Sequence, residues 1–204
     1  MAATTRPLNP TQGEHLHRFN PRRDLRAVAD LVELAFAEEL DSDGRRYIRQ
    51  MRASARAPHM LGLTGYIPSA LTGFVWYQGE TLIGNLSMMP IKVHGRRNYL
   101  IANVAVHPDH RRQGIARALT LAAIEDARKR GGYAAWLQVR ANNPAAVQLY
   151  RDLHFLEVAN RTTWHSAALP PRKREAGIQV RQRRGGDWKQ QQRWLRLDYP
   201  QELT

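Results

Sequence analysis

A basic loop that joins an apolar run to a helical pattern carries the clearest chemical signal in this sequence of 204 residues. The apolar run Leu100–Val106 predicts a buried strand, which the turn His107-Pro108-Asp109 brings to an end. The loop then contains two arginines and a glycine, Arg111, Arg112 and Gly114. A helical pattern follows from Ile115 to about Arg130, so free backbone N–H groups and the positive end of a helix meet at the loop. Such a loop is suited to bind a phosphate.

The glycine spacing of this loop excludes two well-known nucleotide sites. The chain has no GxGxxG before the helix and no GxxxxGKS/T anywhere, so neither the dinucleotide fingerprint nor the P-loop is met. The pattern that remains is R-x-x-G-x-A over residues 111–116, in which the missing Cβ of Gly114 lets a bulky pyrophosphate approach the backbone amides. On this loop alone, an ordinary solvated helix start explains the pattern as well as a phosphate site does.

A second motif follows downstream of the predicted helix. Gly131-Gly132 end that helix, and Tyr133–Val139 predicts another strand. Asn143 is a suitable N-cap and Pro144 a suitable first residue for the next helix. One face of that helix is apolar or aromatic and consists of Ala146, Leu149, Tyr150 and Leu153.

Together the two stretches resemble the GNAT superfamily of N-acetyltransferases, which use acetyl-CoA. The motifs V-A-V-H-P-D-x-R-R-x-G-I-A and V-R-x-x-N-x-x-A-x-x-L-Y-x-x-x-x-F stand in the order and spacing of that family, and they are most similar to its ribosomal-protein alanine acetyltransferase branch. The resemblance covers roughly residues 14–166 and implies an α+β fold with a mixed sheet flanked by helices. It also implies that the cofactor strand and the next strand run parallel but splay apart, with the pantetheine arm of acetyl-CoA in the gap.

The resemblance further implies which residues hold acetyl-CoA. Backbone amides of the cofactor strand would pair with the pantetheine arm and polarise the thioester carbonyl, at Val104 and Val106 with Ala105 between them. The pyrophosphate would lie on the basic loop and the helix start, Arg111, Arg112, Gln113, Gly114, Ile115, Ala116 and Arg117. Asn143 would contact the cofactor arm as well as cap its helix.

Tyr150 is the residue that we expect to act in catalysis. A phenol with an ordinary pKa of about 10 is protonated at neutral pH and can give its proton to the departing thiolate, which is the role of this tyrosine in the resembled motif. A tyrosine of the hydrophobic core is the alternative interpretation. The chain has no cysteine and no GxSxG elbow, so we expect the amine to attack the thioester directly, without a covalent acyl-enzyme.

The sequence does not supply an obvious general base. Gln138 stands where the resembled ribosomal-protein enzymes carry a glutamate, and an amide cannot take a proton. Leu100, where other branches place a glutamate, is apolar. Four remaining candidates are each better explained as structural: His107, His94, Glu80 and Glu39. A weakly basic amine would need no strong base, and a non-catalytic acyl-CoA sensor is the rival hypothesis.

Charge and composition restrict the class of partner. Lys and Arg total 31 against 18 Asp and Glu, a formal net charge of +13, which favours acidic partners such as a phosphorylated cofactor, a nucleic acid or the ribosome. Zero cysteines suit a reducing cytoplasm, the start of the chain has no secretory signal, and no apolar run reaches the length of a membrane helix. We therefore expect a cytoplasmic enzyme without a metal or a membrane contact. A nucleic-acid partner, a homo-oligomer and the acceptor amine (small molecule, antibiotic, peptide N-terminus or protein lysine) stay open.

The first part of the chain predicts a strand and two helices. A short strand over His15–Phe19 precedes an amphipathic helix with Asp24 as its cap, and a second helix spans about Gly44–Ser54. Acidic residues follow the end of the first helix, Glu38, Glu39, Asp41 and Asp43. They either attract a cationic amine or, as is commoner for such clusters, form a solvated helix end.

The middle of the chain predicts a β-hairpin, in which Leu71–Gln78 and Thr81–Pro90 are joined at Gly79-Glu80. A further strand is expected over Leu156–His165. We divide the chain into a flexible lead (1–13), an acetyltransferase domain (14–166), a basic Pro-rich linker (167–177) and a tail (178–204).

The tail repeats the start of the domain when Arg181 is aligned with Arg18. We interpret it as the opening strand and helix of a second GNAT-like unit. This hypothesis predicts that Ile178–Gln182 is extended, that Asp187 to about Leu197 is helical, and that Trp194 packs against protein. A C-terminal helix unrelated to the family and a basic arm for nucleic acid are the alternatives.

Overall fold

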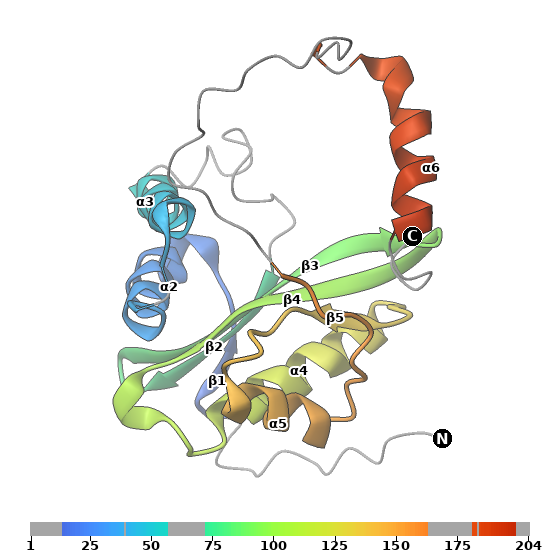
Figure 1. Ribbon diagram of the computed structural model, residues 1–204. Helices are drawn as coiled ribbons and strands as arrows, with labels where there is room; N and C mark the ends of the chain where they lie inside the picture. Colours follow the sequence, from blue (N-terminus) through green and yellow to red (C-terminus); the bar gives the residue numbers. More distant parts are fainter. Residues whose placement is uncertain (1–13, 39, 57–71, 163–180, 183, 199–204) are drawn as a thin grey trace. The chain divides into compact units, whose positions relative to one another are not determined.

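The computed structural model describes residues 14–38, 40–56, 72–162, 181–182 and 184–198 (Figure 1). The chain falls into two compact units, residues 1–155 and 156–204. The first unit contains, in chain order, β1 (Leu16–Arg18), α2 (Pro21–Ala35), α3 (Ser42–Arg56), β2 (Thr72–Gln78), β3 (Thr81–Val93), β4 (Arg96–Val106), the 3-10 helix η2 (Pro108–His110), α4 (Ile115–Lys129), β5 (Ala135–Leu137) and α5 (Pro144–Asp152). None of the helices among the described residues is long and apolar enough to cross a membrane.

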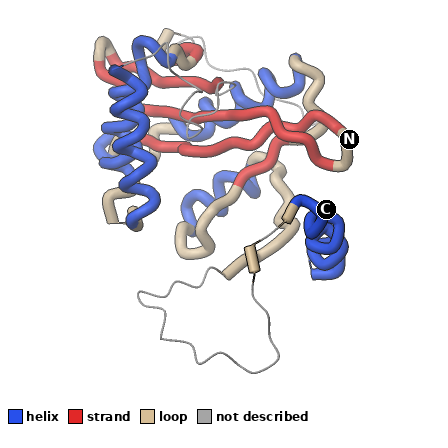
Figure 2. Tube along the Cα trace, turned by 90° about the horizontal axis from the view of Figure 1, so that it is seen from above, coloured by secondary structure: helices blue, strands red, loops and turns tan. Residues whose placement is uncertain are grey.

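The strands of the first unit form one sheet in the order β1-β2-β3-β4-β5 (red in Figure 2). Neighbouring strands are antiparallel except β4 and β5, which are parallel. The predicted mixed sheet is therefore confirmed. The predicted hairpin is also confirmed, because β2 and β3 pair across Gly79-Glu80, where Gly79 has a positive φ of 57°.

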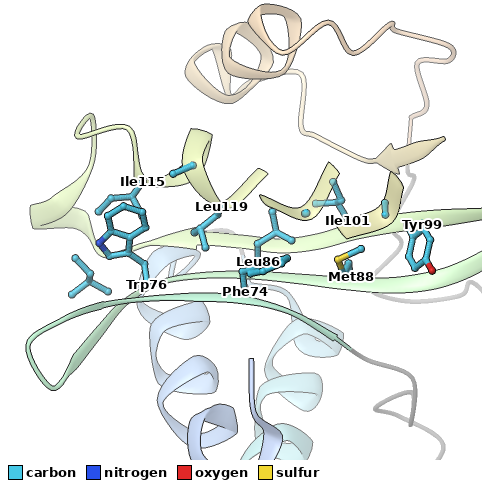
Figure 3. Packing of buried hydrophobic residues seen from close by; sticks show 12 residues of the cluster. Phe74, Trp76, Leu86, Met88, Tyr99, Ile101, Ile115 and Leu119 are labelled. Atoms are coloured by element: carbon cyan, nitrogen blue, oxygen red, sulfur yellow. The ribbon is translucent and has the colours of Figure 1, made fainter. Parts of the chain in front are cut away.

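Helices cover both faces of this sheet, and each face has its own hydrophobic core. The helices α2 and α3 pack against one face, with a core that includes Leu25, Val28, Ile48, Met51, Val75 and Leu82. The helix α4 packs against the other face (Figure 3), with a core that includes Phe74, Trp76, Leu86, Met88, Ile115 and Leu119. Successive residues of β2 thus point to opposite faces, as the period of a strand requires.

The helix α2 begins one turn earlier than predicted, because Asn20 and not Asp24 is its N-cap. The Asn20 side chain accepts a hydrogen bond at 3.0 Å from the N–H of Arg22, the second residue of the helix. Asp24 is completely buried, and it accepts hydrogen bonds from the Asn20 N–H at 2.7 Å and from the Tyr77 hydroxyl at 2.8 Å. Arg23 pairs with the same carboxylate at 2.5 Å. Asp24 therefore joins the helix start to β2.

The helices α4 and α5 both end at a residue in the left-handed conformation. Gly131, with a φ of 72°, follows α4 and confirms the predicted stop. His154, with a φ of 63°, follows α5, and histidine tolerates this conformation better than most residues do. At this second end, the Phe155 N–H donates to the Tyr150 carbonyl at 3.0 Å and the His154 N–H donates to the Arg151 carbonyl at 2.9 Å. This closing turn directs Phe155 back towards Tyr150.

Two predicted strands are wrong in extent. The stretch Tyr133–Val139 forms a strand only over Ala135–Leu137. The stretch Leu156–His165 forms no strand over its described part, residues 156–162. Leu156 is 86% exposed, so the alternating pattern there buries no apolar face. A strand gains its stability from a neighbouring strand and a covered face, and the sequence pattern alone does not reveal either.

The second unit contains the 3-10 helix η3 (Gly185–Asp187) and the helix α6 (Trp188–Asp198). Arg181 pairs with Asp187 at 2.7 Å, and the Arg184 N–H donates to the same carboxylate at 2.7 Å, so an acidic side chain stands at the helix start. The predicted helix is thus confirmed, whereas the predicted strand lies mostly outside the described residues. Trp194 is 56% exposed, contrary to the packing predicted for it. The relation of this tail to a second GNAT-like unit stays a prediction.

We expect Asp24→Ala to lower the free energy of unfolding by about 2–4 kcal/mol, because the Tyr77 hydroxyl and the Asn20 N–H lose their acceptor, the fully buried Asp24 carboxylate. Asp30→Ala on the same helix is the control. Asp30 is exposed, and its partner Arg52 keeps Glu33 at 2.6 Å, so this change should lower the free energy by less than about 1 kcal/mol. Urea unfolding followed by circular dichroism measures both values. Equal losses in the two variants would contradict the role of Asp24 in joining the start of α2 to β2.

Candidate active site

The parallel ladder between β4 and β5 ends after a few residues. Tyr99 pairs with Ala135, and the last pair is Ile101 with Leu137. Beyond it, β4 continues to Val106 without β5 as a partner. This ending agrees with the splay that the sequence resemblance implied for the cofactor strand and the next strand.

A cavity of about 330 Å³ opens where the two strands separate. Its walls come from α2, α3, β4, the segment that leaves β5, and α5. The apolar part of the wall includes Val32, Phe36, Leu40, Ile48, Ile101, Val104, Leu137, Val139 and Ala146. The polar part consists of Tyr47, Asn103, Gln138, Arg140, Asn143 and Tyr150. A mostly apolar cavity with a few polar groups is typical of a small-molecule site.

A bulge in β4 lies in the wall of this cavity. Asn103 has a positive φ of 50°, and the register with β3 skips, so that Leu86 opposes both Asn103 and Val104. The fully buried Asn85 side chain donates a hydrogen bond to the Asn103 carbonyl at 2.9 Å. Asparagine is among the few residues other than glycine that adopt this conformation readily. The bulge is therefore specified by the residues at these positions, Asn85 and Asn103.

The three strand residues predicted to contact the cofactor differ in their surroundings. Val104 lines the cavity. Ala105 is 1% exposed and belongs to the core under α2 and α3, while Val106 packs against the core under α4. The side chains of Ala105 and Val106 are thus used in packing, and only their backbone groups are available for a cofactor.

The basic loop presents backbone amides as predicted. Arg112 and Gly114 have positive φ angles of 59° and 82°. Ala118 donates a hydrogen bond to the Gly114 carbonyl at 2.9 Å, so the N–H groups of the three residues before Ala118 have no acceptor inside α4. A Cβ placed on Gly114 would meet no atom within 4 Å, so the space beside the loop is open. These features fit the pyrophosphate of acetyl-CoA.

One arginine of the loop has a structural contact that the sequence did not predict. Arg111 donates a hydrogen bond to the Ala35 carbonyl at 3.1 Å, at the last residue of α2. The Arg111 side chain therefore ties the loop to the opposite layer of the unit. Arg112 and Arg117 are exposed, and their guanidinium groups are the better candidates for phosphate contacts.

Asn143, the N-cap of α5, and Tyr150, within α5, both line the cavity. The Asn143 side chain accepts a hydrogen bond from the Ala146 N–H at 3.1 Å, so the predicted N-cap is confirmed. Tyr150 is 8% exposed, and its ring packs edge-on against Phe155 at 5.7 Å between ring centres. Burial raises the pKa of Tyr150, so the hydroxyl stays protonated at neutral pH. Tyr150 is thus a core residue and a cavity residue at once.

The described wall of the cavity holds neither a carboxylate nor an imidazole. Gln138 occupies the wall position where the resemblance led us to look for a base. The other candidates lie elsewhere: Glu80 in the turn between β2 and β3, His94 in the turn between β3 and β4, and His107 beside η2, while Glu39 is outside the described residues. Searching the part of the chain that the structure describes, we find no group of three or more potential ligands that could hold a metal ion.

Asp41, one of the acidic residues that follow α2, lies at the start of α3. Asp41 accepts a hydrogen bond from the Gly44 N–H at 2.7 Å, and this bond lowers the pKa of Asp41. An aspartate in this position satisfies a free N–H of the first turn of α3. For Asp41, the contact favours a helix end over a role in attracting the substrate, while Glu39 lies outside the described residues.

Sequence reasoning missed Tyr47 and the contact that holds it. The Asn103 side chain donates a hydrogen bond to the Tyr47 hydroxyl oxygen at 3.2 Å, and both residues line the cavity. Two signals were present in the sequence. Asn103 is a polar residue within an apolar strand, and Tyr47 stands next to Ile48 in a helix with few other apolar residues.

Comparison with known proteins identifies a family. The model of the Acetyltransferase (GNAT) family matches residues 28–155 of this chain. The matched residues include the separating strands β4 and β5, the basic loop and the whole of α5. The resemblance carried by the two sequence motifs is therefore confirmed.

Curated relatives match parts of the chain. The ribosomal protein bS18-alanine N-acetyltransferase of Escherichia coli (strain K12) is 46% identical over 63 residues, which are 31% of this chain and 43% of that protein. The mycothiol acetyltransferase of Thermobispora bispora is 29% identical over 151 residues, which are 71% of this chain and 47% of that protein. The chain thus spans less than half the length of these relatives. Both relatives are acetyltransferases by name.

Solved structures share the fold at low identity. A putative acetyltransferase from Agrobacterium tumefaciens str. C58 has a TM-score of 0.55 and 22% identity, and the match covers 75% of this chain and 99% of that chain. A GCN5-related N-acetyltransferase from Ralstonia eutropha JMP134 has a TM-score of 0.53 and 21% identity, with 76% and 98% covered. These matches confirm the predicted α+β fold with its flanked mixed sheet.

We expect Gly114→Val to weaken acetyl-CoA binding by roughly tenfold or more, because a branched side chain at a left-handed position displaces the loop amides. Gly131→Val is the matched control. Gly131 also has a positive φ and open surroundings, but it stands at the other end of α4. Both changes add strain of about 1–3 kcal/mol, which thermal unfolding compares. Titration calorimetry measures the affinity, and equal weakening in both variants would contradict the loop assignment.

Proposed function

This chain belongs to the GNAT acetyltransferase family, and from that membership we propose that it transfers the acetyl group of acetyl-CoA to a weakly basic primary amine. The observation that carries the proposal is the cavity between the separating ends of β4 and β5. Its wall contains the free edge of β4 together with Asn143 and Tyr150, and the basic loop comes directly after β4 in the chain. The absence of cysteine suits the reducing cytoplasm, where we propose that the enzyme acts.

Three groups of this chain would hold the donor. Acetyl-CoA, when bound, supplies the acetyl group as an activated thioester. The free amides at the start of α4, with the Arg112 and Arg117 side chains, are suited to its pyrophosphate. The edge of β4 beyond Ile101 has no β5 partner, so its backbone amides can orient the pantetheine arm and polarise the thioester carbonyl at Val104. Asn143 lies in the same wall and can contact that arm.

Tyr150 is the proton donor in this proposal. Because burial raises its pKa, the hydroxyl holds its proton at neutral pH and can transfer it to the sulfur that leaves as the amide forms. The nitrogen loses one proton as it becomes an amide, and water can carry that proton to the phenolate. The chain then returns to its starting state, and no proton is gained or lost by the enzyme.

The acceptor is expected to arrive as a neutral amine, because no described residue in the cavity wall can take its proton. Ordinary pKa values are about 7.7–8.0 for an α-amino group and about 10.4 for lysine, so at pH 7 about one α-amine in ten is neutral, against about one lysine in 2,500. The α-amino group of a peptide or protein is therefore the better supported acceptor. An alanine N-acetyltransferase among the relatives agrees with this choice.

Radiolabelled acetyl-CoA tests the proposal directly. The purified chain is incubated with an N-terminal alanine peptide, the same peptide blocked at its N-terminus but carrying a free lysine, and a panel of small amines. We expect transfer to the free α-amine. Calorimetric binding of acetyl-CoA is measured beside it. Binding without transfer to any amine would overturn the enzymatic proposal in favour of an acyl-CoA sensor.

We expect Tyr150→Phe to leave acetyl-CoA affinity near the wild-type value and to lower kcat on the alanine peptide by roughly 10²–10⁴-fold, the usual effect of losing a proton donor. The phenylalanine keeps the edge-on packing against Phe155, so the unfolding temperature should change little. Steady-state kinetics and calorimetry make the two measurements. If kcat is unchanged, Tyr150 is a core residue and another group protonates the leaving thiolate.

We expect kcat/KM for the alanine peptide to rise about tenfold per pH unit until the amine is neutral near about pH 8. The raised pKa of Tyr150 keeps the donor protonated past its ordinary pKa of about 10, so kcat/KM should not decline at any pH below about 10. Gln138→Glu adds a carboxylate to the wall and should raise kcat/KM below pH 7, which flattens the profile. Identical pH profiles for the wild type and Gln138→Glu would mean that a carboxylate at position 138 does not deprotonate the amine.

A further inference from the structure

Tyr47 brings a second phenolic hydroxyl to the wall of the cavity, and the proposed reaction gives it no role. Tyr150 comes from α5, whereas Tyr47 comes from α3 on the other side of the sheet's free edge. The apolar residues Phe36 and Ile48 belong to the same α2–α3 part of the wall. The two hydroxyls therefore approach one cavity from different elements, and only one of them is needed by the leaving thiolate.

The bulge in β4 fixes the Tyr47 hydroxyl. The Asn103 side chain donates its N–H to the Tyr47 oxygen at 3.2 Å. The Asn103 backbone is itself held, because its φ of 50° belongs to the bulge and its carbonyl accepts the buried Asn85 side chain at 2.9 Å. The hydroxyl is thus oriented by a chain of contacts that starts in the core of the sheet.

The proton of this hydroxyl has no acceptor among the described residues. Since the Tyr47 oxygen accepts from Asn103, its own O–H is available to the cavity. Burial is the main cause that raises the pKa of Tyr47, so the group is a neutral hydrogen-bond donor near pH 7. A neutral donor recognises a carbonyl or similar oxygen, and it gives no advantage to an ammonium group.

We propose that Tyr47 donates a hydrogen bond to the carbonyl oxygen next to the acceptor's amine, and that Asn103 is the positioning residue that orients Tyr47 for this contact. The inference rests on the proposed function and deepens it. In a peptide, the carbonyl carbon of the first residue is two bonds from the α-amino nitrogen. In a lysine side chain, the carbon at that distance from the amine is a methylene. The thioester carbonyl has its own donors on the edge of β4. Tyr47 would therefore select peptide-like amines over simple alkyl amines.

The test is Tyr47→Phe, assayed with an N-terminal alanine peptide and with propargylamine, a weakly basic amine that lacks a carbonyl. We expect KM for the peptide to rise about tenfold, as the loss of a hydrogen bond of about 1.4 kcal/mol implies, with kcat nearly unchanged. Kinetics with propargylamine and the Kd for acetyl-CoA should stay at wild-type values. Tyr133→Phe makes the same chemical change at a residue that is 68% exposed and outside the cavity wall, and it should change nothing.

A second variant tests the positioning role of Asn103. Asn103→Asp keeps a residue that tolerates a positive φ, but its carboxylate accepts the Tyr47 O–H and withdraws that proton from the cavity. We expect KM for the peptide to rise as in Tyr47→Phe, and the double variant to be no worse than either single one. Thermal unfolding verifies that each variant is folded.

The outcomes separate the two proposals. If the wild-type chain does not acetylate the peptide, the proposed function fails. If it does and Tyr47→Phe has an unchanged KM for the peptide, or loses affinity for acetyl-CoA, or is equally impaired with propargylamine, the inference about Tyr47 is overturned. A wild-type KM in Asn103→Asp would overturn the positioning role of Asn103.

Discussion

Parallel pairing between β4 and β5 stops at Ile101 and Leu137, and the geometry of the site follows from that stop. A ladder that continued to Val106 would use the backbone groups of β4 for its neighbour and would close the space between the strands. Because it stops, one sheet supplies both a rigid wall and a free edge. The loop that follows β4 in the chain and the helix that follows β5 carry the two groups that the proposed reaction uses, the free amides at the start of α4 and the Tyr150 hydroxyl.

The bulge at Asn103 adds a second constraint, and it is built from amide side chains. Asn85 is fully buried and donates to the Asn103 carbonyl, while Asn103 donates to Tyr47. Buried polar groups are costly unless they are paired, so such a series of contacts favours a single arrangement of the strand. The packing of the sheet is thereby transmitted to a hydroxyl group in the cavity. The α3 side of the cavity is consequently as well defined as the α5 side.

Local sequence rules predicted the parts of the fold that local interactions decide. Asn143 with Pro144, and Gly79 with Glu80, specify a helix start and a turn within a few residues, and both predictions are confirmed. The cap of α2 was misassigned because Asn20 and Asp24 are both good caps, and the choice depends on Tyr77, which is distant in the chain.

Long-range contacts also explain what sequence reasoning missed at the site. Tyr47 reaches the cavity wall because of how α3 packs against one face of the sheet, and the residue periodicity of α3 does not reveal that packing. The prediction of a strand over Leu156–His165 was wrong for a related reason. The sequence pattern is a local property, whereas a strand also needs a neighbouring strand, which the pattern does not show. The motif residues of the loop and of α5 could be selected from the sequence because they stand in the order and spacing of the family motifs.

The short pairing of β5 also has a consequence for the lifetime of the chain. Local unfolding begins where few backbone bonds hold a segment, and β5 pairs with β4 over only three residues, Ala135–Leu137. A donor molecule lying in the gap would bridge β4 and α5 and would stabilise this segment by mass action. Amide hydrogens of β5 would then exchange with solvent more slowly as acetyl-CoA accumulates. Proteolysis of this segment would then be slower when acetyl-CoA is abundant than when it is scarce.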